Sequence, residues 1–342
     1  MLNLKQTNLN IIFIGTADFA VPALKSLIEN KINIIQVITQ PDKLVNRDQV
    51  LHASPIKQVS LEHKIPIFQP ENIKDKKNIE IIKKMRPDLI VVAAYGQILP
   101  KEILEIPKFG CVNIHASLLP KYRGASPIQF ALLNGDKETG VTIIIMDTKM
   151  DTGKIIQTIK CEIKNYYDNQ VLHNHLANLG AELLINTLPK YIQETEKILN
   201  LWQKKHRKNL TIGQIDFINS QFILDNSSLI KQYESKASYT KILKREDGKI
   251  DWTKSAQEIQ NQIHALSPWP GSFTEFKKKN LKIFQTKISN ESNSYKPGKF
   301  FLTLNNELAI RCGQNNLIIQ ELQIEGKKRM PSQDFLKGNP IS

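Results

Sequence analysis

The first half of the chain alternates continuous apolar runs with amphipathic stretches, and this alternation limits the possible folds more than any other feature. The apolar runs are predicted to be buried strands at residues 11–15, 34–39, 89–94, 111–115 and 141–146. Helices are expected between them, at residues 19–30, 79–86 and 128–134. Strands that are apolar along their whole length and separated by helices indicate a parallel sheet covered on both faces. We therefore predict an open, doubly wound α/β domain with a mostly parallel sheet.

A long amphipathic helix is expected at residues 170–195, and the alternation of apolar strands and helices ends after it. A polar, basic stretch from residue 203 to 236 has weak periodicity and is predicted to be a linker with an irregular insertion. From residue 240 onward, one helix is followed by short strands with polar turns, which is typical of a small β-barrel. The predicted division is a first domain at 1–200, a linker at 201–238 and a second domain at 239–342.

Positive charge is concentrated in the second half of the chain. The formal net charge is +14. Residues 1–200 hold 24 Lys and Arg against 20 Asp and Glu, whereas residues 201–342 hold 23 against 13. Such an imbalance suits a polyanionic partner such as RNA, although a lysine-rich composition of the whole chain is an equally good explanation from charge alone.

Several classes of protein are disfavoured. No stretch is long and apolar enough for a membrane span, and the apolar run near the start is not followed by the small-residue cleavage site of a signal peptide. The three cysteines are scattered and odd in number, which suits a reducing compartment. Neither they nor the seven histidines have metal-ligand spacing, so we expect no metal.

The strand-to-helix turn at Gly15 resembles the opening of a nucleotide-binding, Rossmann-like βαβ unit. It has only one of the three glycines that allow a backbone to wrap a pyrophosphate. A tight turn that needs one glycine explains it better, so a dehydrogenase is a minor alternative.

The stretch from Cys111 to Gln129 carries the candidate chemistry. If residues 111–115 form a strand, Asn113 and His115 project from the same face near its carboxyl end. Ligands of open α/β sheets bind at that end. The breaks at Pro120, Gly124 and Pro127 then predict a loop shaped around a ligand.

A carboxylate follows the next predicted strand, at Asp151. It lies in a glycine-ended loop beside the strand of His115, where it could orient the imidazole. Taken singly, a histidine at a strand end and an aspartate before Thr-Gly are often structural. Asn113 is harder to explain in this way, because asparagine is depleted in strands and needs partners when buried. Together the three side chains could handle an acyl group at neutral pH.

At this point the residues resemble the 10-formyltetrahydrofolate-dependent formyltransferases, through Asn113-x-His115-x-Ser117-Leu118-Leu119-Pro120-x-Tyr122-Arg123-Gly124, Gly140-Val141-Thr142 and Asp151-Thr152-Gly153. The resemblance implies the doubly wound domain, 10-formyltetrahydrofolate as co-substrate, and Asn113, His115 and Asp151 as the catalytic group. It also implies that Ser117, Leu118, Leu119 and Pro120 line the folate site. In the mechanism expected from it, Asn113 and His115 stabilise an oxyanion and Asp151 orients His115 and assists proton transfer.

The flanking motifs resemble the branch of that family that acts on methionyl-tRNA, among them Gln40-Pro41-Asp42-Lys43, Ala94-Tyr95-Gly96-Gln97, Gly248-Lys249-Ile250-Asp251-Trp252 and Pro268-Trp269-Pro270-Gly271. This implies initiator methionyl-tRNA as the partner and an OB-like C-terminal barrel that binds it. Arg47 and Lys43 are the expected tRNA contacts of the first domain, in a loop that lacks the family's neighbouring basic and glycine residues. The barrel would contribute Lys277, Lys278, Lys279, Lys327 and Lys328.

Other functions stay open at this level. The acceptor could be a sugar amine, a purine ribonucleotide or water, the last in a hydrolase of formyl-folate. A non-catalytic RNA-binding module would also carry the basic second half. We expect a cytoplasmic monomer that does not bind membranes.

Overall fold

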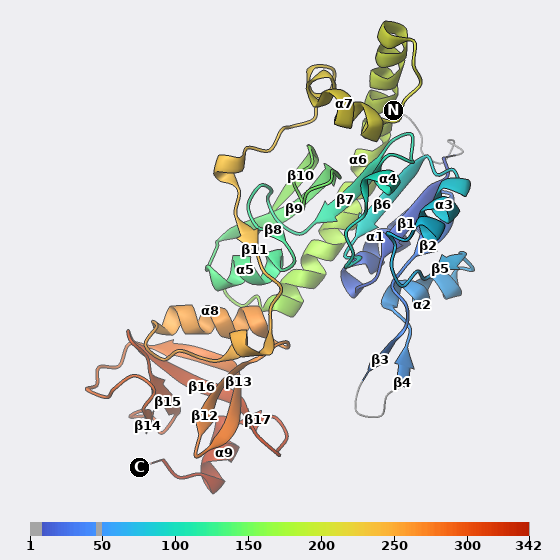
Figure 1. Ribbon diagram of the computed structural model, residues 1–342. Coiled ribbons are helices and arrows are strands. Elements are labelled where there is room, and N and C mark those ends of the chain that lie inside the picture. The colour runs from blue at the N-terminus through green and yellow to red at the C-terminus, as the bar shows by residue number, and fades with distance from the viewer. Residues whose placement is uncertain (1–8, 46–49, 342) are drawn as a thin grey trace. The chain divides into compact units, whose positions relative to one another are not determined.

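A computed structural model describes residues 9–45 and 50–341. The chain divides into two compact units that alternate along the sequence (Figure 1). Unit 1 consists of Met1–Gly124, Thr139–Cys161 and Asn174–Tyr239, and unit 2 of Ala125–Glu138, Glu162–His173 and Thr240–Ser342.

Unit 1 is built on a sheet of seven strands in the order β10-β9-β7-β6-β1-β2-β5. The strands are β1 (Ile11–Gly15), β2 (Ile34–Ile38), β5 (Ile67–Phe68), β6 (Leu89–Ala93), β7 (Cys111–His115), β9 (Glu138–Ile145) and β10 (Ile155–Glu162). β1, β2, β5, β6 and β7 pair in parallel, and β9 runs antiparallel to β7. The predicted doubly wound, mostly parallel sheet is confirmed, with its antiparallel part at one edge.

Helices cover both faces of this sheet. On one face, Ile82 of α3 and Ile103 of α4 join the core formed by Ile12, Ile90 and Cys111. On the other face, Gly180 of α6 lies against Ile114 of β7, where an added Cβ atom would be 2.9 Å from the isoleucine side chain. The helices of unit 1 are α1 (Val21–Glu29), α2 (Pro55–Glu62), α3 (Lys76–Lys84), α4 (Lys101–Leu104), most of α6 (Asn169–His206) and α7 (Ile212–Asp225), whereas α5 (Pro127–Leu133) belongs to unit 2. Short elements are η2 (Asp18–Ala20), β3 (Lys43–Val45), β4 (Val50–His52), β8 (Arg123–Gly124), η3 (Glu234–Lys236) and β11 (Tyr239–Thr240).

The stretch from 203 to 236 is more regular than predicted. The prediction of an irregular insertion is wrong here, because α6 continues to His206 and α7 follows. Thr211 and Gln214 form a capping box that satisfies the first amides of α7. Ile212 and Ile215 are buried, but Phe217 and Ile218 of the same helix are exposed. Because apolar side chains lie on both the buried and the exposed sides of α7, its periodicity in the sequence is weak.

Unit 2 contains an antiparallel sheet in the order β12-β13-β16-β15-β14, with β17 paired to β16. Its elements are η4 (Arg245–Gly248), α8 (Ala256–Leu266), β12 (Ser272–Phe276), β13 (Lys279–Ser289), β14 (Phe300–Leu302), β15 (Leu308–Arg311), β16 (Asn316–Ile324), β17 (Met330–Pro331) and α9 (Ser332–Gly338). Ile259 of α8 and Phe335 of α9 pack into the core of this sheet. Over the described residues the sheet does not close between β12 and β14, so the expected OB-like barrel is a half-barrel.

None of the helices within residues 9–45 and 50–341 combines the length and the apolar character that crossing a bilayer requires.

Candidate active site

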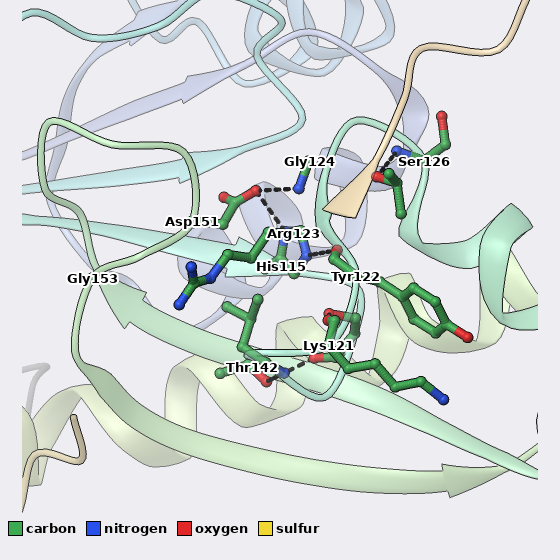
Figure 2. A network of polar contacts seen from close by, with 12 residues as sticks. His115, Lys121, Tyr122, Arg123, Gly124, Ser126, Thr142, Asp151 and Gly153 are labelled. Atoms are coloured by element: carbon green, nitrogen blue, oxygen red, sulfur yellow. Dashed lines mark hydrogen bonds and ion pairs between the residues drawn. The ribbon is translucent and has the colours of Figure 1, made fainter. Parts of the chain in front are cut away.

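β7 ends at His115, whose imidazole ring is 6% exposed and is held on two sides (Figure 2). Its Nε2 atom lies 2.9 Å from the backbone oxygen of Tyr122. Because a carbonyl oxygen can only accept a hydrogen bond, Nε2 carries the proton in this arrangement. The Nδ1 atom lies 3.6 Å from Oδ2 of Asp151. The structure therefore brings His115 and Asp151 together, with Nδ1 facing the carboxylate.

Asp151 lies in the turn between β9 and β10, with its backbone in the left-handed region at φ 54°. Aspartate tolerates this region better than most residues, but the conformation still needs support. Part of that support is the Gly124 N–H, which donates a 2.8 Å hydrogen bond to Oδ2 (Figure 2). One carboxylate oxygen thus faces both the imidazole and a backbone donor.

Asn113 lies two residues before His115 on β7, so both side chains project from the same face of the sheet. It is partly exposed, whereas the other residues of this strand are buried. Its amide makes no hydrogen bond with any residue that the structure describes. The amide can therefore donate to a ligand without breaking an internal contact.

The loop from Ser117 to Pro120 is anchored on β9 through Thr142. The buried Thr142 hydroxyl donates to the Ser117 carbonyl oxygen at 2.7 Å and accepts from the Leu119 N–H at 3.2 Å. Ser117 and Leu119 are themselves buried. Leu118 and Pro120 are partly exposed, so these two predicted folate residues can contact a ligand directly.

Arg123 is the largest side chain that is almost fully buried, at 1% exposure. Its guanidinium donates to Gln232 at 3.1 Å, to Glu234 at 2.7 Å and to the Tyr239 hydroxyl at 2.9 Å. Burial lowers the pKa of Arg123, but the hydrogen bonds and charge of Glu234, together with Tyr239, outweigh it and hold that pKa above its usual value. The guanidinium therefore stays charged and presents its N–H donors in a fixed arrangement.

A cavity of about 730 Å³ lies beside this cluster. Its walls come from the loop 147–154, from α7 and from residues 231–239, and include Arg123, Thr152 and Gln232. The cavity borders the Asp151 loop on the side of α7, and the residues of the 117–120 loop do not line it.

The predicted basic residues within the described part of the chain are exposed. Lys43 is exposed at the start of β3, and Arg47 lies outside the described residues. In unit 2, exposed lysines occupy the turn before β13, the first position of β13 and the segment after β16: Lys277, Lys278, Lys279, Lys327 and Lys328. The described lysines are thus accessible to a polyanion.

Residues 9–188 match the family described as Formyl transferase, and residues 242–340 match Formyl transferase, C-terminal domain. A relative named methionyl-tRNA formyltransferase from Citrifermentans bemidjiense is 40% identical over 334 residues, which cover 97% of this chain and 94% of that protein. The chain belongs to the formyl transferase family.

Another relative and a solved structure also match the chain over nearly its whole length. The methionyl-tRNA formyltransferase of Caldanaerobacter subterraneus subsp. tengcongensis is 40% identical, with 97% of this chain and 98% of that protein covered. The crystal structure of an N-formyltransferase from Helicobacter canadensis in complex with folinic acid and dTDP-3-aminofucose has a TM-score of 0.57 at 21% identity, covering 93% of this chain and 99% of that one. At that identity the likeness shows a shared fold.

Three contributors to the site of this formyl transferase are absent from the sequence prediction. The Tyr122 carbonyl and the Gly124 amide are backbone groups, so their role cannot be predicted from the type of residue. Gln232 lies in the polar stretch that we predicted to be a linker, 81 residues from its partner Asp151. Only the folded chain shows that it reaches the Asp151 loop.

Proposed function

We propose that this protein transfers a formyl group from 10-formyltetrahydrofolate to the amino group of methionine esterified to initiator tRNA. The observation that carries the proposal is the full-length match at 40% identity to relatives named methionyl-tRNA formyltransferase. The pairing of His115 with Asp151, at 3.6 Å between Nδ1 and Oδ2, supports it. A sugar amine, a purine ribonucleotide or water is a less favoured acceptor.

The reaction requires stabilisation of negative charge more than strong base catalysis. A free α-amino group has a pKa of about 7.7–8.0, so a usable fraction is neutral and nucleophilic at neutral pH. As the amine attacks the formyl carbon, the carbonyl oxygen becomes negative. The Asn113 amide, which is partly exposed and has no internal partner among the described residues, is the donor we assign to that oxygen. A preorganised donor of this kind contributes roughly 10²–10³ in rate.

His115 acts on the substrate through Nδ1, since Nε2 is occupied by the Tyr122 carbonyl. In the doubly protonated ring, Nδ1–H is a second donor for the developing oxyanion. Asp151 stabilises that charged ring and accepts the proton that the attacking amine loses, directly or through water. That proton passes to the folate nitrogen as its bond to the formyl carbon breaks. The pair thus combines orientation of the ring with proton transfer.

The folate supplies an activated formyl group on a nitrogen that can leave. We assign its contact to the loop of Ser117, Leu118, Leu119 and Pro120. Leu118 and Pro120 provide partly exposed apolar surface, whereas Ser117 and Leu119 keep the loop in shape through Thr142.

We assign tRNA binding to basic residues of both units. Exposed lysines on the turns of the half-barrel, Lys277, Lys278, Lys279, Lys327 and Lys328, would contact phosphates, as would Lys43 and Arg47. Since translation starts in the cytoplasm, we place the activity there, and we propose that the protein acts as a monomer.

The deciding experiment incubates the protein with 10-formyltetrahydrofolate and methionyl-tRNA and assays N-formylmethionyl-tRNA. Parallel reactions contain an amino sugar nucleotide, a purine ribonucleotide amine or no acceptor. Product from tRNA alone supports the proposal, whereas product from another amine, or formate without an acceptor, would overturn it. The affinity for tRNA should fall steeply as salt rises, and an affinity that does not change with salt would contradict the assigned phosphate contacts.

A further inference from the structure

The segment 230–239, which follows α7, lies against both loops of the active site. Ile230 pairs with Ile155, the first residue of β10, through two backbone hydrogen bonds of 2.9 Å. Ser238 accepts from the Tyr122 N–H through its hydroxyl oxygen, at 2.8 Å, and from the Arg123 N–H through its carbonyl oxygen, at 2.8 Å. The segment is therefore attached at one end to the strand after Asp151 and at the other end to the loop after His115.

Gln232 connects this segment to the backbone of the Asp151 loop. Its Nε2 donates to the carbonyl oxygen of Asp151 at 2.9 Å and to that of Gly153 at 2.7 Å. Its Oε1 accepts from Nε of Arg123 at 3.1 Å. Both hydrogens and the oxygen of the amide are thus used, and the side chain is 8% exposed. Because Nε of Arg123 must face the amide oxygen and the two carbonyl oxygens must face the amide nitrogen, the Gln232 amide has only one possible orientation.

We infer that Gln232 is a positioning residue for Asp151, oriented in turn by the buried guanidinium of Arg123. Asp151 needs such support because its φ of 54° lies in a region that side-chain-bearing residues adopt at a cost. Gly124 holds its carboxylate and Gln232 holds its carbonyl, so the two contacts fix the residue from opposite ends. Lys154 adds a third attachment through its ion pair with Asp216 of α7.

The proposal rests on the proposed function, and it gives the linker a role in the chemistry. Residues 212–239 would set the geometry between Asp151 and Nδ1 of His115 without touching the substrate. A displacement of about 1 Å in a catalytic group can cost roughly 10²-fold in rate. The expected signature of Gln232 is therefore a loss of turnover with substrate affinities retained.

The test uses Gln232→Glu, which keeps the shape of the side chain but places an oxygen where Nε2 donates to two carbonyls. Gln262→Glu is the matched control. Gln262 is also 8% exposed, and its Nε2 also donates to two backbone carbonyls, those of Asp247 and Lys249, within unit 2. Both full-length variants are compared with the wild-type protein by thermal unfolding, by single-turnover formylation of methionyl-tRNA at saturating substrates, and by steady-state rates over a range of substrate concentrations that give each KM.

We expect Q232E to lower the single-turnover rate about 10²-fold with each KM within about twofold of wild type. Q262E should retain the wild-type rate at a temperature where it is folded. In an Asp151→Asn background, Q232E should cost little more, because a residue that acts through Asp151 has nothing left to position.

Three results would overturn the inference: a wild-type rate in folded Q232E, a loss confined to KM, or an undiminished effect of Q232E when Asp151→Asn is present. If Q232E does not fold, Gln232→Asn is used in its place, since it keeps the amide but shortens its reach. Absence of formylation by the wild-type protein would instead count against the proposed function.

Discussion

The Nδ1 atom of His115 lies 3.6 Å from Oδ2 of Asp151, although β7 ends at His115 and the antiparallel strand β9, which precedes Asp151, ends beside the start of β7. The same oxygen accepts from the Gly124 N–H, so the carboxylate is held in place independently of the imidazole. A change that removes its charge but keeps its acceptor should therefore leave the loop intact.

Asp151→Asn is expected to lower formyl transfer about 10²–10⁴-fold while the unfolding temperature stays near that of wild type, since the retained amide oxygen can still accept from Gly124. Rate measurements with methionyl-tRNA test the expected loss of formyl transfer, and thermal unfolding tests the expected retention of stability. Asp147→Asn is the control within the same loop: Oδ1 of Asp147 accepts from the Lys149 N–H and the Thr152 hydroxyl, and asparagine can keep both contacts. Equal rates in the two variants would argue against a catalytic role for Asp151.

Asn113→Ala should reduce turnover roughly 10²–10³-fold with little loss of stability. The amide has no hydrogen bond to lose among the described residues, so its removal leaves no buried group unpaired. Asn78→Ala is the control, and it should change stability but not turnover. Asn78 is 5% exposed and donates to the Asn72 carbonyl at 2.8 Å, so this variant should lose about 1–3 kcal/mol of unfolding free energy and keep its turnover. Denaturant titration and single-turnover rates distinguish the two patterns, and a stable, fully active N113A protein would contradict the oxyanion assignment.

Gly213→Ala tests whether α7 is a packed part of unit 1. An added Cβ atom would lie 2.5 Å from the Leu104 carbonyl oxygen, which is backbone and cannot swing away. We expect a loss of about 1–3 kcal/mol in unfolding free energy, measured in urea. Gly338→Ala is the control, because nothing lies within 4 Å of the atom added at that helical position. If both variants unfold like wild type, α7 does not pack as described.

His264 should make the stability of unit 2 depend on pH. Burial lowers the pKa of its imidazole below the usual value of 6.5, and the charge of Asp168 only partly opposes this. The unfolded chain therefore binds the proton more readily than the folded one as the pH falls. The stabilisation is complete above the unfolded pKa and is lost on acidification toward the lower, folded pKa.

His264→Gln should flatten this dependence. Urea unfolding of wild type and H264Q at several values between about pH 8 and pH 5 measures it. The wild-type protein should lose more stability than H264Q on acidification. Parallel curves would show that His264 is not the responsible group.

Much of unit 1 could be predicted from the sequence. The run at 11–15 is a strand with those bounds, because a fully buried parallel strand leaves an uninterrupted apolar pattern. Residues 111–115 also form a strand with the predicted bounds. The same strand boundary placed Asn113 and His115 on one face. Spacing and residue type are local properties, so these features are present before the chain folds.

Tertiary structure alone decided the rest. That β9 runs against β7, that Nε2 of His115 is occupied by the Tyr122 carbonyl, and that Gln232 holds the Asp151 loop all depend on contacts between distant parts of the chain. Backbone donors and acceptors carry no residue identity, and a glutamine in a polar stretch resembles any surface glutamine. The sequence by itself determined which side chains were available for chemistry. Folding decided which atoms of those side chains remained free to act, because hydrogen bonding within the protein occupies some of them and leaves others for the substrate.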